Sequence, residues 1–389
     1  MTRFWKPAFL IFVCLVASAT LVSCSGGPAS IPEDDHGSPE EYLERFIGNS
    51  GAGLPALAVS VIKDGTVVYR DILGTHRASD IAPAEAGDPF HIGSNTKAMT
   101  AMLAAVFVDR GLISWTSTIR SVLGEVPRMQ ADYADVTLAE LLSHSGGLPA
   151  SLPLTVWNTY FPWYSEHGAD RAAMVEDILA QPPQKPAGQA FIYSNSGYVV
   201  AGMMLERVGG AHWEELMRRE LFLPLGMATA GFGPPARNDG PLQGTAPWGH
   251  SPHPVDPMSI AGDNPQALGP AGTVHASLAD LEAYVRCYLQ GGVADSGIRI
   301  ISSDSLEELL RPRLANYALG WGVGQTNSGK RLVTHDGSNT MFFCSITILP
   351  DEGHAIIVMT NRGDGRTSAM VERITRFLGQ QFLGETMGH

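Results

Sequence analysis

Lysine is scarce in this chain of 389 residues: it occurs five times, and arginine supplies nearly all of the positive charge. The formal net charge is −13, and no stretch concentrates Lys or Arg into a stripe that could neutralise phosphates. These two observations exclude a nucleic-acid partner. With 44% hydrophobic and only 17% charged residues, the chain is also not disordered and is long enough for a large core.

Cysteine and long apolar runs are scarce as well. Of the four cysteines, only Cys287 and Cys344 lie in the body of the chain. Two are too few for a disulfide framework, and the sequence leaves open whether they are free or form one bridge.

The longest apolar run, "PAFLIFVCLVASA", follows Arg3 and Lys6 at the N-terminus and is too short to span a bilayer comfortably. It is followed by "LVSC", ending in Cys24, which resembles a bacterial lipoprotein signal. We expect a signal peptide over 1–23, a lipid on Cys24 and a flexible tether over 24–39, rich in Gly, Ser, Pro and acidic residues. Cleavage near "ASA" and an uncleaved anchor are the alternatives. Each of these predicts export to the cell envelope.

Apolar alternation predicts strands at both ends of the chain. "ALAVSVIKDGTVVYRDILG" indicates a hairpin that turns at Asp64 and Gly65. "LGWGVGQT", "RLVTHDG", "MFFCSITILP" and "HAIIVMTNR" indicate further strands, and "LADLEAYVRCYL", "SDSLEELLRPRL" and "VERITRFLGQQFL" indicate helices. We therefore predict an α/β (α+β) fold with an antiparallel sheet built from both termini, over about 40–93 and 271–389. A mostly helical lobe over about 94–270 is inserted between them.

A lysine stands at the head of one apolar segment, "SNTKAMTAMLAAVFVDR", which predicts a buried helix over 94–110. Residues three apart share a helix face, so the Ser94 hydroxyl and the Lys97 amine can meet. A buried, neutral lysine can take the proton of a serine nucleophile. The alternative is an ordinary N-cap beside a surface lysine.

Two further polar motifs follow in the chain. Tyr193, Ser194 and Asn195 open another apolar helix in "FIYSNSGYVV", and "LVTHDGSN" ends a strand in His335 to Ser338. A nucleophile, an amine, a phenol and a Gly-containing strand end together describe acyl transfer through a covalent intermediate.

The three motifs, with "ADVTLAELLSHSGGLP", "LFLPLGMATAGFG" and "GPAGTVHASLADLEAYV", resemble the serine β-lactamase and penicillin-recognising hydrolase superfamily. The resemblance is to its class C related branch of β-lactamases, D-alanyl-D-alanine peptidases and esterases, and runs from about residue 54 to the C-terminus. It implies Ser94 as the acylated nucleophile, and Lys97 and Tyr193 as its proton partners. It does not indicate which of the two is the base.

The resemblance also implies the substrate contacts. Asn195 would hold the lysine and a substrate amide, the strand at His335 and Gly337 would lie along the acyl chain, and the backbone N–H groups of Ser94 and Ser338 would form the oxyanion hole. It implies a small-molecule or peptidoglycan-type substrate and no cofactor.

The third motif departs from the usual Lys-Thr-Gly, because His335-Asp336-Gly337 offers less positive charge for a substrate carboxylate. We therefore expect an ester or an amide, including D-amino-acid peptides, to be preferred over efficient β-lactam turnover. The aromatic loop 157–164 either walls an apolar pocket or packs in the core.

The remaining polar residues carry weaker signals. We interpret His144 in "SHSGG" as part of a structural turn, and we expect no metal at His250 and His253, which lack a third ligand nearby. A rival hypothesis keeps the fold without catalysis, as a lipid-tethered module that binds peptidoglycan or a partner. The intact Ser94, Lys97 and Tyr193 argue against it.

Overall fold

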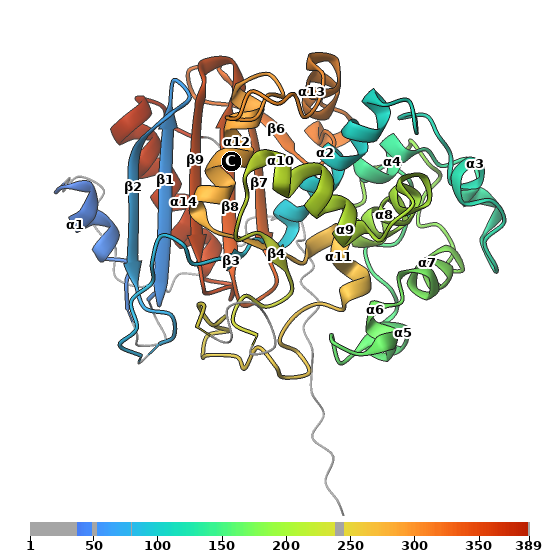
Figure 1. Cartoon of the computed structure of the whole chain (residues 1–389), viewed down its shortest axis with the longest axis horizontal. Helices are drawn as coiled ribbons and strands as arrows, with labels where there is room; N and C mark the ends of the chain where they lie inside the picture. Colours follow the sequence, from blue (N-terminus) through green and yellow to red (C-terminus); the bar gives the residue numbers. More distant parts are fainter. Residues whose placement is uncertain (1–36, 49–52, 79, 238–244, 388–389) are drawn as a thin grey trace, which may run out of the picture.

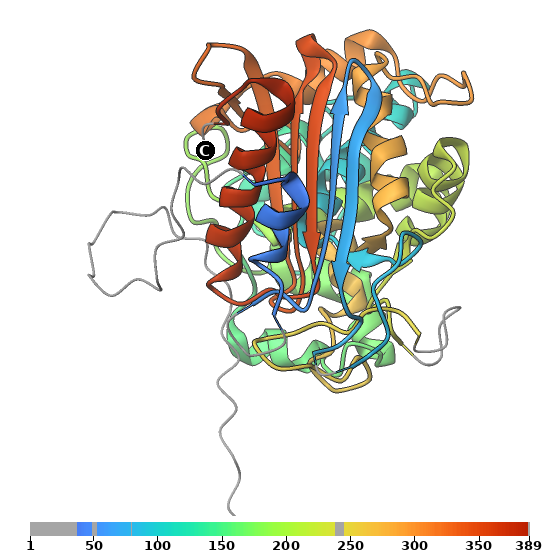
Figure 2. The same ribbon diagram turned by 90° about the vertical axis from the view of Figure 1, so that its left-hand side faces the viewer.

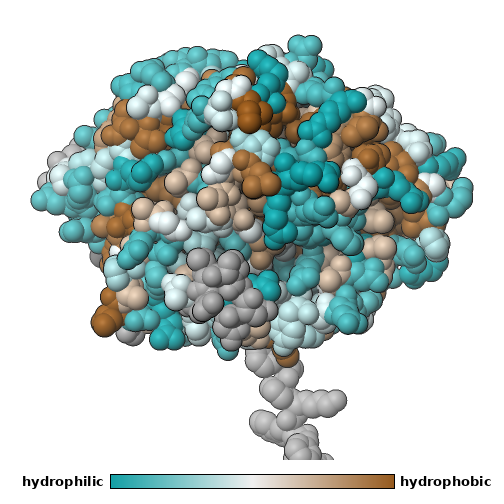
Figure 3. Space-filling view, viewed as in Figure 1, coloured by the Kyte–Doolittle hydropathy of each residue, from teal (hydrophilic) through white to brown (hydrophobic). Residues whose placement is uncertain are grey.

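The computed structural model describes residues 37–48, 53–78, 80–237 and 245–387. The predicted signal peptide, the lipidation site at Cys24 and nearly all of the tether lie outside the described residues. Within the described part, no helix is both long and apolar enough to cross a membrane. Apolar side chains on the face seen in Figure 3 are interspersed with hydrophilic ones, which is usual for a protein surface.

One antiparallel sheet of six strands forms the body of the molecule, in the order β2-β1-β9-β8-β7-β6 (Figure 1). The N-terminal strands therefore pair directly with the C-terminal ones, as predicted. The strands are β1 (Ala56–Lys63), β2 (Thr66–Gly74), β6 (Gly322–Gln325), β7 (Arg331–Ser338), β8 (Phe343–Leu349) and β9 (His354–Thr360).

The hairpin between β1 and β2 turns at the predicted residues. Asp64 and Gly65 have φ values of 52° and 72°, and Lys63 pairs with Thr66. Positive φ at both central residues is the geometry that matches the twist of a hairpin, and Asp-Gly is suited to it.

Both faces of this sheet are covered by helices. On one face, α1 (Pro39–Glu44) and α14 (Thr367–Leu378) lie side by side, as Figure 2 shows, and the rings of Tyr42 and Phe377 stack at 3.8 Å. Helix α1 begins at Pro39, because Ser38 and Glu41 form a capping box and proline suits the first helical position. The other face packs on α2 (Thr96–Asp109) and α12 (Leu278–Leu289), which bury their apolar residues in the larger core.

The middle of the chain is mostly helical, as predicted. Helix α8 (Asn195–Gly209) packs against α2 in this lobe. The other helices are α3 (Ile119–Leu123), α4 (Leu138–Leu142), α5 (Leu154–Trp157), α6 (Glu166–Ala169), α7 (Arg171–Leu179), α9 (Trp213–Met217), α10 (Leu223–Leu225) and α11 (Gly269–Gly272), with α13 (Ser303–Leu310) beyond them. A small second sheet joins β3 (Phe90–His91), β5 (Val274–Ala276) and β4 (Gly231–Phe232).

Candidate active site

Ser94 lies in a single 3-10 turn, Gly93–Asn95, that leads into α2. One turn further on, Lys97 is fully buried, and its Nζ lies 2.9 Å from Ser94 Oγ and 2.7 Å from the carbonyl oxygen of Ala271. Burial holds the pKa of Lys97 well below its usual value of 10.5, because a charged amine is poorly solvated there. The hydroxyl and an amine able to accept its proton are thus adjacent.

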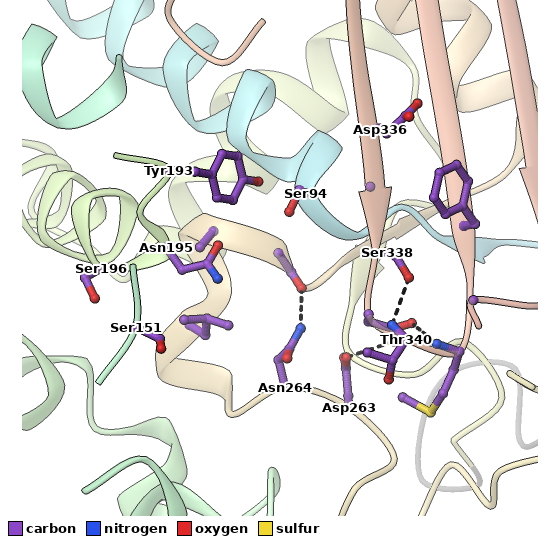
Figure 4. A pocket seen from close by; sticks show the side chains of 18 of the residues that line it. Ser94, Ser151, Tyr193, Asn195, Ser196, Asp263, Asn264, Asp336, Ser338 and Thr340 are labelled. Atoms are coloured by element: carbon purple, nitrogen blue, oxygen red, sulfur yellow. Dashed lines mark hydrogen bonds between the residues drawn. The ribbon is translucent and has the colours of Figure 1, made fainter. Parts of the chain in front are cut away.

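Tyr193 precedes Ser194, the N-cap residue of α8, and its ring lies beside Lys97. Lys97 Nζ lies 4.9 Å from the centre of its ring, and the Tyr193 hydroxyl points toward Ser94 (Figure 4). Burial raises the pKa of Tyr193, against the opposing effect of a hydrogen bond with Ser94. At neutral pH the phenol therefore keeps its proton.

Asn195 begins α8, and its side chain extends into the cavity beside Tyr193 (Figure 4). The resemblance implied that the Asn195 side chain holds Lys97. In the structure Lys97 donates to the Ala271 carbonyl of α11 instead, whereas the Asn195 backbone N–H donates to Ala150 O. Contact between the Asn195 amide and a substrate stays a prediction.

The third motif lies at the end of β7, where it touches the nucleophile turn. A Cβ on Gly337 would come 2.0 Å from Ile92 O and 2.7 Å from Ser94 N, and one on Gly93 would come 2.2 Å from Ser338 N. Two glycines therefore let the two backbones meet. This approach brings the backbone segments that carry Ser94 N and Ser338 N close together. An oxyanion hole formed by their N–H groups stays a prediction.

His335 faces inward from β7 and is buried, with its Nε2 3.0 Å from the hydroxyl of Tyr317. Burial, the largest cause, lowers the pKa of His335 to about 3. The imidazole is therefore neutral at physiological pH. Asp336, the next residue on β7, is exposed and points away from Ser94 (Figure 4).

These side chains line a cavity of about 800 Å³. Its outer walls differ in character. One is apolar and the other carries carboxylates, and no Lys or Arg is among the described residues that line it. The apolar wall includes Leu152, Trp157, Phe161, Met174, Ile178 and Leu268, and the acidic residues are Asp263, Asp336 and Asp364, of which Asp336 turns its side chain away from Ser94.

The aromatic loop 157–164 divides between the two alternatives. Trp157 and Phe161 line the cavity, whereas Tyr160 and Trp163 are buried, Tyr160 in the larger core. Cys287 and Cys344 are both buried and free, so they form no disulfide. No cluster of three or more metal-ligating side chains occurs among the described residues.

The turn predicted at His144 is present, with a φ of 58°. Its side chain, however, does more than the sequence indicated. Nδ1 accepts a hydrogen bond from Ser194 N at 3.0 Å, the His144 carbonyl accepts one from Ile192 N at 2.8 Å, and the ring lies 4.3 Å from that of Tyr193. His144 therefore holds the backbone on both sides of Tyr193. The sequence signal was "SHSGG" itself, but nothing in it indicated the partner.

Comparisons with known proteins identify the family of the chain. A family model described as Beta-lactamase matches residues 43–381. Penicillin-binding protein 4 of Amycolatopsis lactamdurans is 27% identical over 341 residues, which cover 84% of this chain and 86% of that protein.

Among solved structures, the octameric penicillin-binding protein homologue from Pyrococcus abyssi has a TM-score of 0.70 at 21% identity, covering 89% of this chain and 77% of that one. A D-stereospecific amidohydrolase from Streptomyces sp. has a TM-score of 0.65 at 21% identity, covering 90% and 99%. These two likenesses concern the fold. Since the family model spans most of the chain, including every residue of the site described above, the protein belongs to the beta-lactamase family.

Proposed function

We propose that this protein is a serine hydrolase that works through an acyl-enzyme on Ser94. The observation that carries the proposal is the 2.9 Å contact between Ser94 Oγ and the buried Lys97 Nζ. A serine hydroxyl needs an adjacent base, and a lysine with a lowered pKa can serve as one at neutral pH.

The chemistry balances with the groups at hand. As Ser94 Oγ attacks the carbonyl carbon, its proton moves to Lys97 Nζ, and the N–H groups of Ser94 and Ser338 stabilise the oxyanion. Collapse breaks the bond to the leaving alcohol or amine, which takes a proton by way of the Tyr193 hydroxyl. Water then attacks the acyl carbon and gives its proton to neutral Lys97 Nζ, and the bond to Ser94 Oγ breaks as Lys97 returns that proton to Ser94 Oγ and the acid is released. The opposite pKa directions of the two residues favour Lys97 as base and Tyr193 as proton shuttle.

For the substrate, we propose an ester or an amide, including D-amino-acid peptides, over an efficiently hydrolysed β-lactam. A neutral His335 and cavity walls without Lys or Arg among the described residues give a substrate carboxylate little to bind. The apolar wall with Trp157 and Phe161 suits an apolar acyl or alcohol group. The amidohydrolase from Streptomyces, similar in fold, gives the amide half of this proposal a precedent.

A hydrolysis panel tests the proposal. We expect p-nitrophenyl esters and D-alanyl peptide amides to be cleaved faster than nitrocefin, and a fluorophosphonate probe to add one adduct to wild type and none to Ser94→Ala. Equal labelling of Ser94→Ala would refute the mechanism. Retention on peptidoglycan by both proteins, without turnover of any substrate, would favour the non-catalytic binding module.

We also propose that the enzyme acts at the cell envelope, held by a lipid on Cys24. The "LVSC" pattern and the polar segment after it support this. The expected result is that wild type incorporates labelled palmitate and sediments with membranes, whereas Cys24→Ser does neither. Palmitate incorporation by Cys24→Ser would show that Cys24 is not the lipid site.

A further inference from the structure

A buried carboxylate at the cavity wall, Asp263, has no role in the chemistry above. It is 3% exposed and lies on the segment that leads to α11, on the β7 side of the cavity in Figure 4. Its Oδ1 accepts a hydrogen bond from Asn339 Nδ2 at 3.1 Å, and its Oδ2 lies 3.2 Å from His91 Nε2. A buried carboxylate needs polar partners that compensate for its lost hydration. Of these two partners, His91 contacts the turn that carries Ser94 and Asn339 lies at the end of β7.

The first partner leads to the nucleophile turn. His91 Nδ1 accepts the backbone N–H of Gly93 at 3.1 Å, which leaves Nε2 as the ring nitrogen that can donate toward Asp263. The Nε2–Oδ2 contact is not directed along a hydrogen bond, and neither atom has another partner in the described part of the chain. It acts as an electrostatic attraction that keeps the proton on Nε2. Nδ1 thereby stays an acceptor for Gly93, the residue before Ser94.

The second partner leads to the end of β7. Asn339 follows Ser338, and its Oδ1 accepts the backbone N–H groups of Met341 at 3.2 Å and Phe342 at 3.0 Å. These bonds fix the turn after β7, in which Thr340 has a φ of 72°. The bond from Asn339 Nδ2 to Asp263 ties this turn to the same carboxylate.

We infer that Asp263 is a positioning residue that aligns the two backbone donors of the oxyanion hole. Through His91 and Gly93 it acts on the N–H of Ser94, and through Asn339 on the N–H of Ser338. This inference rests on the proposed function, because it needs an oxyanion to form at Ser94. Such alignment affects the transition state more than the bound substrate, since the donors bind the oxyanion most strongly once charge develops.

The test compares Asp263→Asn with Asp280→Asn. Asp280 is also a buried, hydrogen-bonded carboxylate, but it caps α12 away from the cavity. In Asp263→Asn, we expect kcat for a p-nitrophenyl ester and the rate of fluorophosphonate labelling to fall about 10- to 100-fold, with KM changed less than about threefold. The pKa of the acid limb of the kcat profile should not move, because Lys97 is untouched. Asp280→Asn should keep wild-type kinetics.

A pair of His91 variants keeps the test decisive if Asp263→Asn does not fold. His91→Gln can still accept from Gly93 and donate to Asp263, whereas His91→Phe keeps a ring and loses both contacts. We expect the Gln variant to retain most of kcat and the Phe variant to lose about as much as Asp263→Asn.

Three results would overturn the inference. The first is a higher KM with unchanged kcat in Asp263→Asn, which would make Asp263 a substrate contact. The second is unchanged kcat in Asp263→Asn, and the third is equal kcat in the two His91 variants. Failure of the proposed function looks different, since wild type itself would then take up no probe at Ser94.

Discussion

Replacing Gly337 with alanine tests whether the contact between β7 and the nucleophile turn builds the active site. The added Cβ would lie 2.0 Å from Ile92 O, 2.7 Å from Ser94 N and 2.8 Å from Asn95 N. A carbon rarely approaches a carbonyl oxygen closer than about 3.3 Å, so the two segments must separate by roughly 1.3 Å. All three clashing atoms belong to the backbone and cannot rotate away.

A separation of this size displaces Ser338 N–H from the oxyanion that Ser94 would form. Misplacement by about 1 Å costs on the order of 100-fold in rate, and loss of one oxyanion donor costs about 100- to 1,000-fold. We therefore expect kcat/KM of Gly337→Ala to fall by about 100- to 1,000-fold. Overpacking should also lower the free energy of unfolding by about 1–3 kcal/mol.

Ester hydrolysis and urea unfolding measure the two effects. Gly324→Ala is the matched control, because Gly324 lies on the neighbouring strand β6 and a Cβ there meets no atom within 4 Å. Its kinetics should match wild type. If Gly337→Ala kept kcat/KM within about threefold of the control, the close approach would not be what aligns the donors, and the reasoning would be refuted.

Three other variants or measurements probe buried groups. Lys97→Met should abolish turnover yet be more stable than wild type at pH 7. Below pH 10.5, wild type takes up a proton on unfolding, because the pKa of Lys97 is lowered in the folded state. Its free energy of unfolding should therefore rise with pH by up to about 1.4 kcal/mol per pH unit and approach that of the variant near pH 10.5. Urea titrations from pH 6 to 10 measure this, and parallel curves for the two proteins would contradict it. His144→Phe keeps a ring against Tyr193 but leaves the backbone N–H of Ser194 without its acceptor. We expect steady-state kinetics to give a kcat about tenfold lower with KM unchanged, and a smaller loss in His144→Gln, which can still accept this hydrogen bond. Equal losses in the two variants would contradict the role of His144 in holding the backbone around Tyr193. The buried thiols of Cys287 and Cys344 should resist alkylation in the folded protein and react after unfolding, as measured by mass spectrometry. Burial raises the pKa of Cys287 to about 12, which keeps it in the unreactive thiol form. If dithiothreitol lowered the thermal midpoint, the two thiols would not be free.

Local patterns explain what the sequence predicted well. Helix α12 occupies the residues of "LADLEAYVRCYL", and the Asp64-Gly65 turn closes the first hairpin, because period and turn chemistry depend on neighbouring residues. The Ser94–Lys97 contact was also accessible, since it needs only one turn of helix. The helix itself begins later than expected, at Thr96, because Gly93–Asn95 form a separate 3-10 turn before it.

Long-range contacts account for what the sequence did not reveal. The carbonyl that receives the Lys97 amine is 174 residues away, and Asp263 and Asn339 are 76 residues apart. No periodicity links such positions. The sequence also gives no sign that Asp263 is buried beside His91, because both look like ordinary polar residues of loops. The aromatic loop 157–164 was ambiguous for the same reason, because which rings face the cavity depends on how α5 and its neighbours pack.

Because β1 pairs with β9, the sheet can be completed only after the last strand of the chain has been made. Ser94, the proposed nucleophile, is made early, but β7, which would supply the second donor of the proposed oxyanion hole, comes from the last fifth of the chain and is held in the sheet by β8 and β9. Contacts between such distant segments close slowly, because the intervening chain must first be ordered. A chain that stops before β9 therefore carries Ser94 and Lys97 without the completed sheet that holds β7 against them, and on the proposed mechanism we expect it to be inactive.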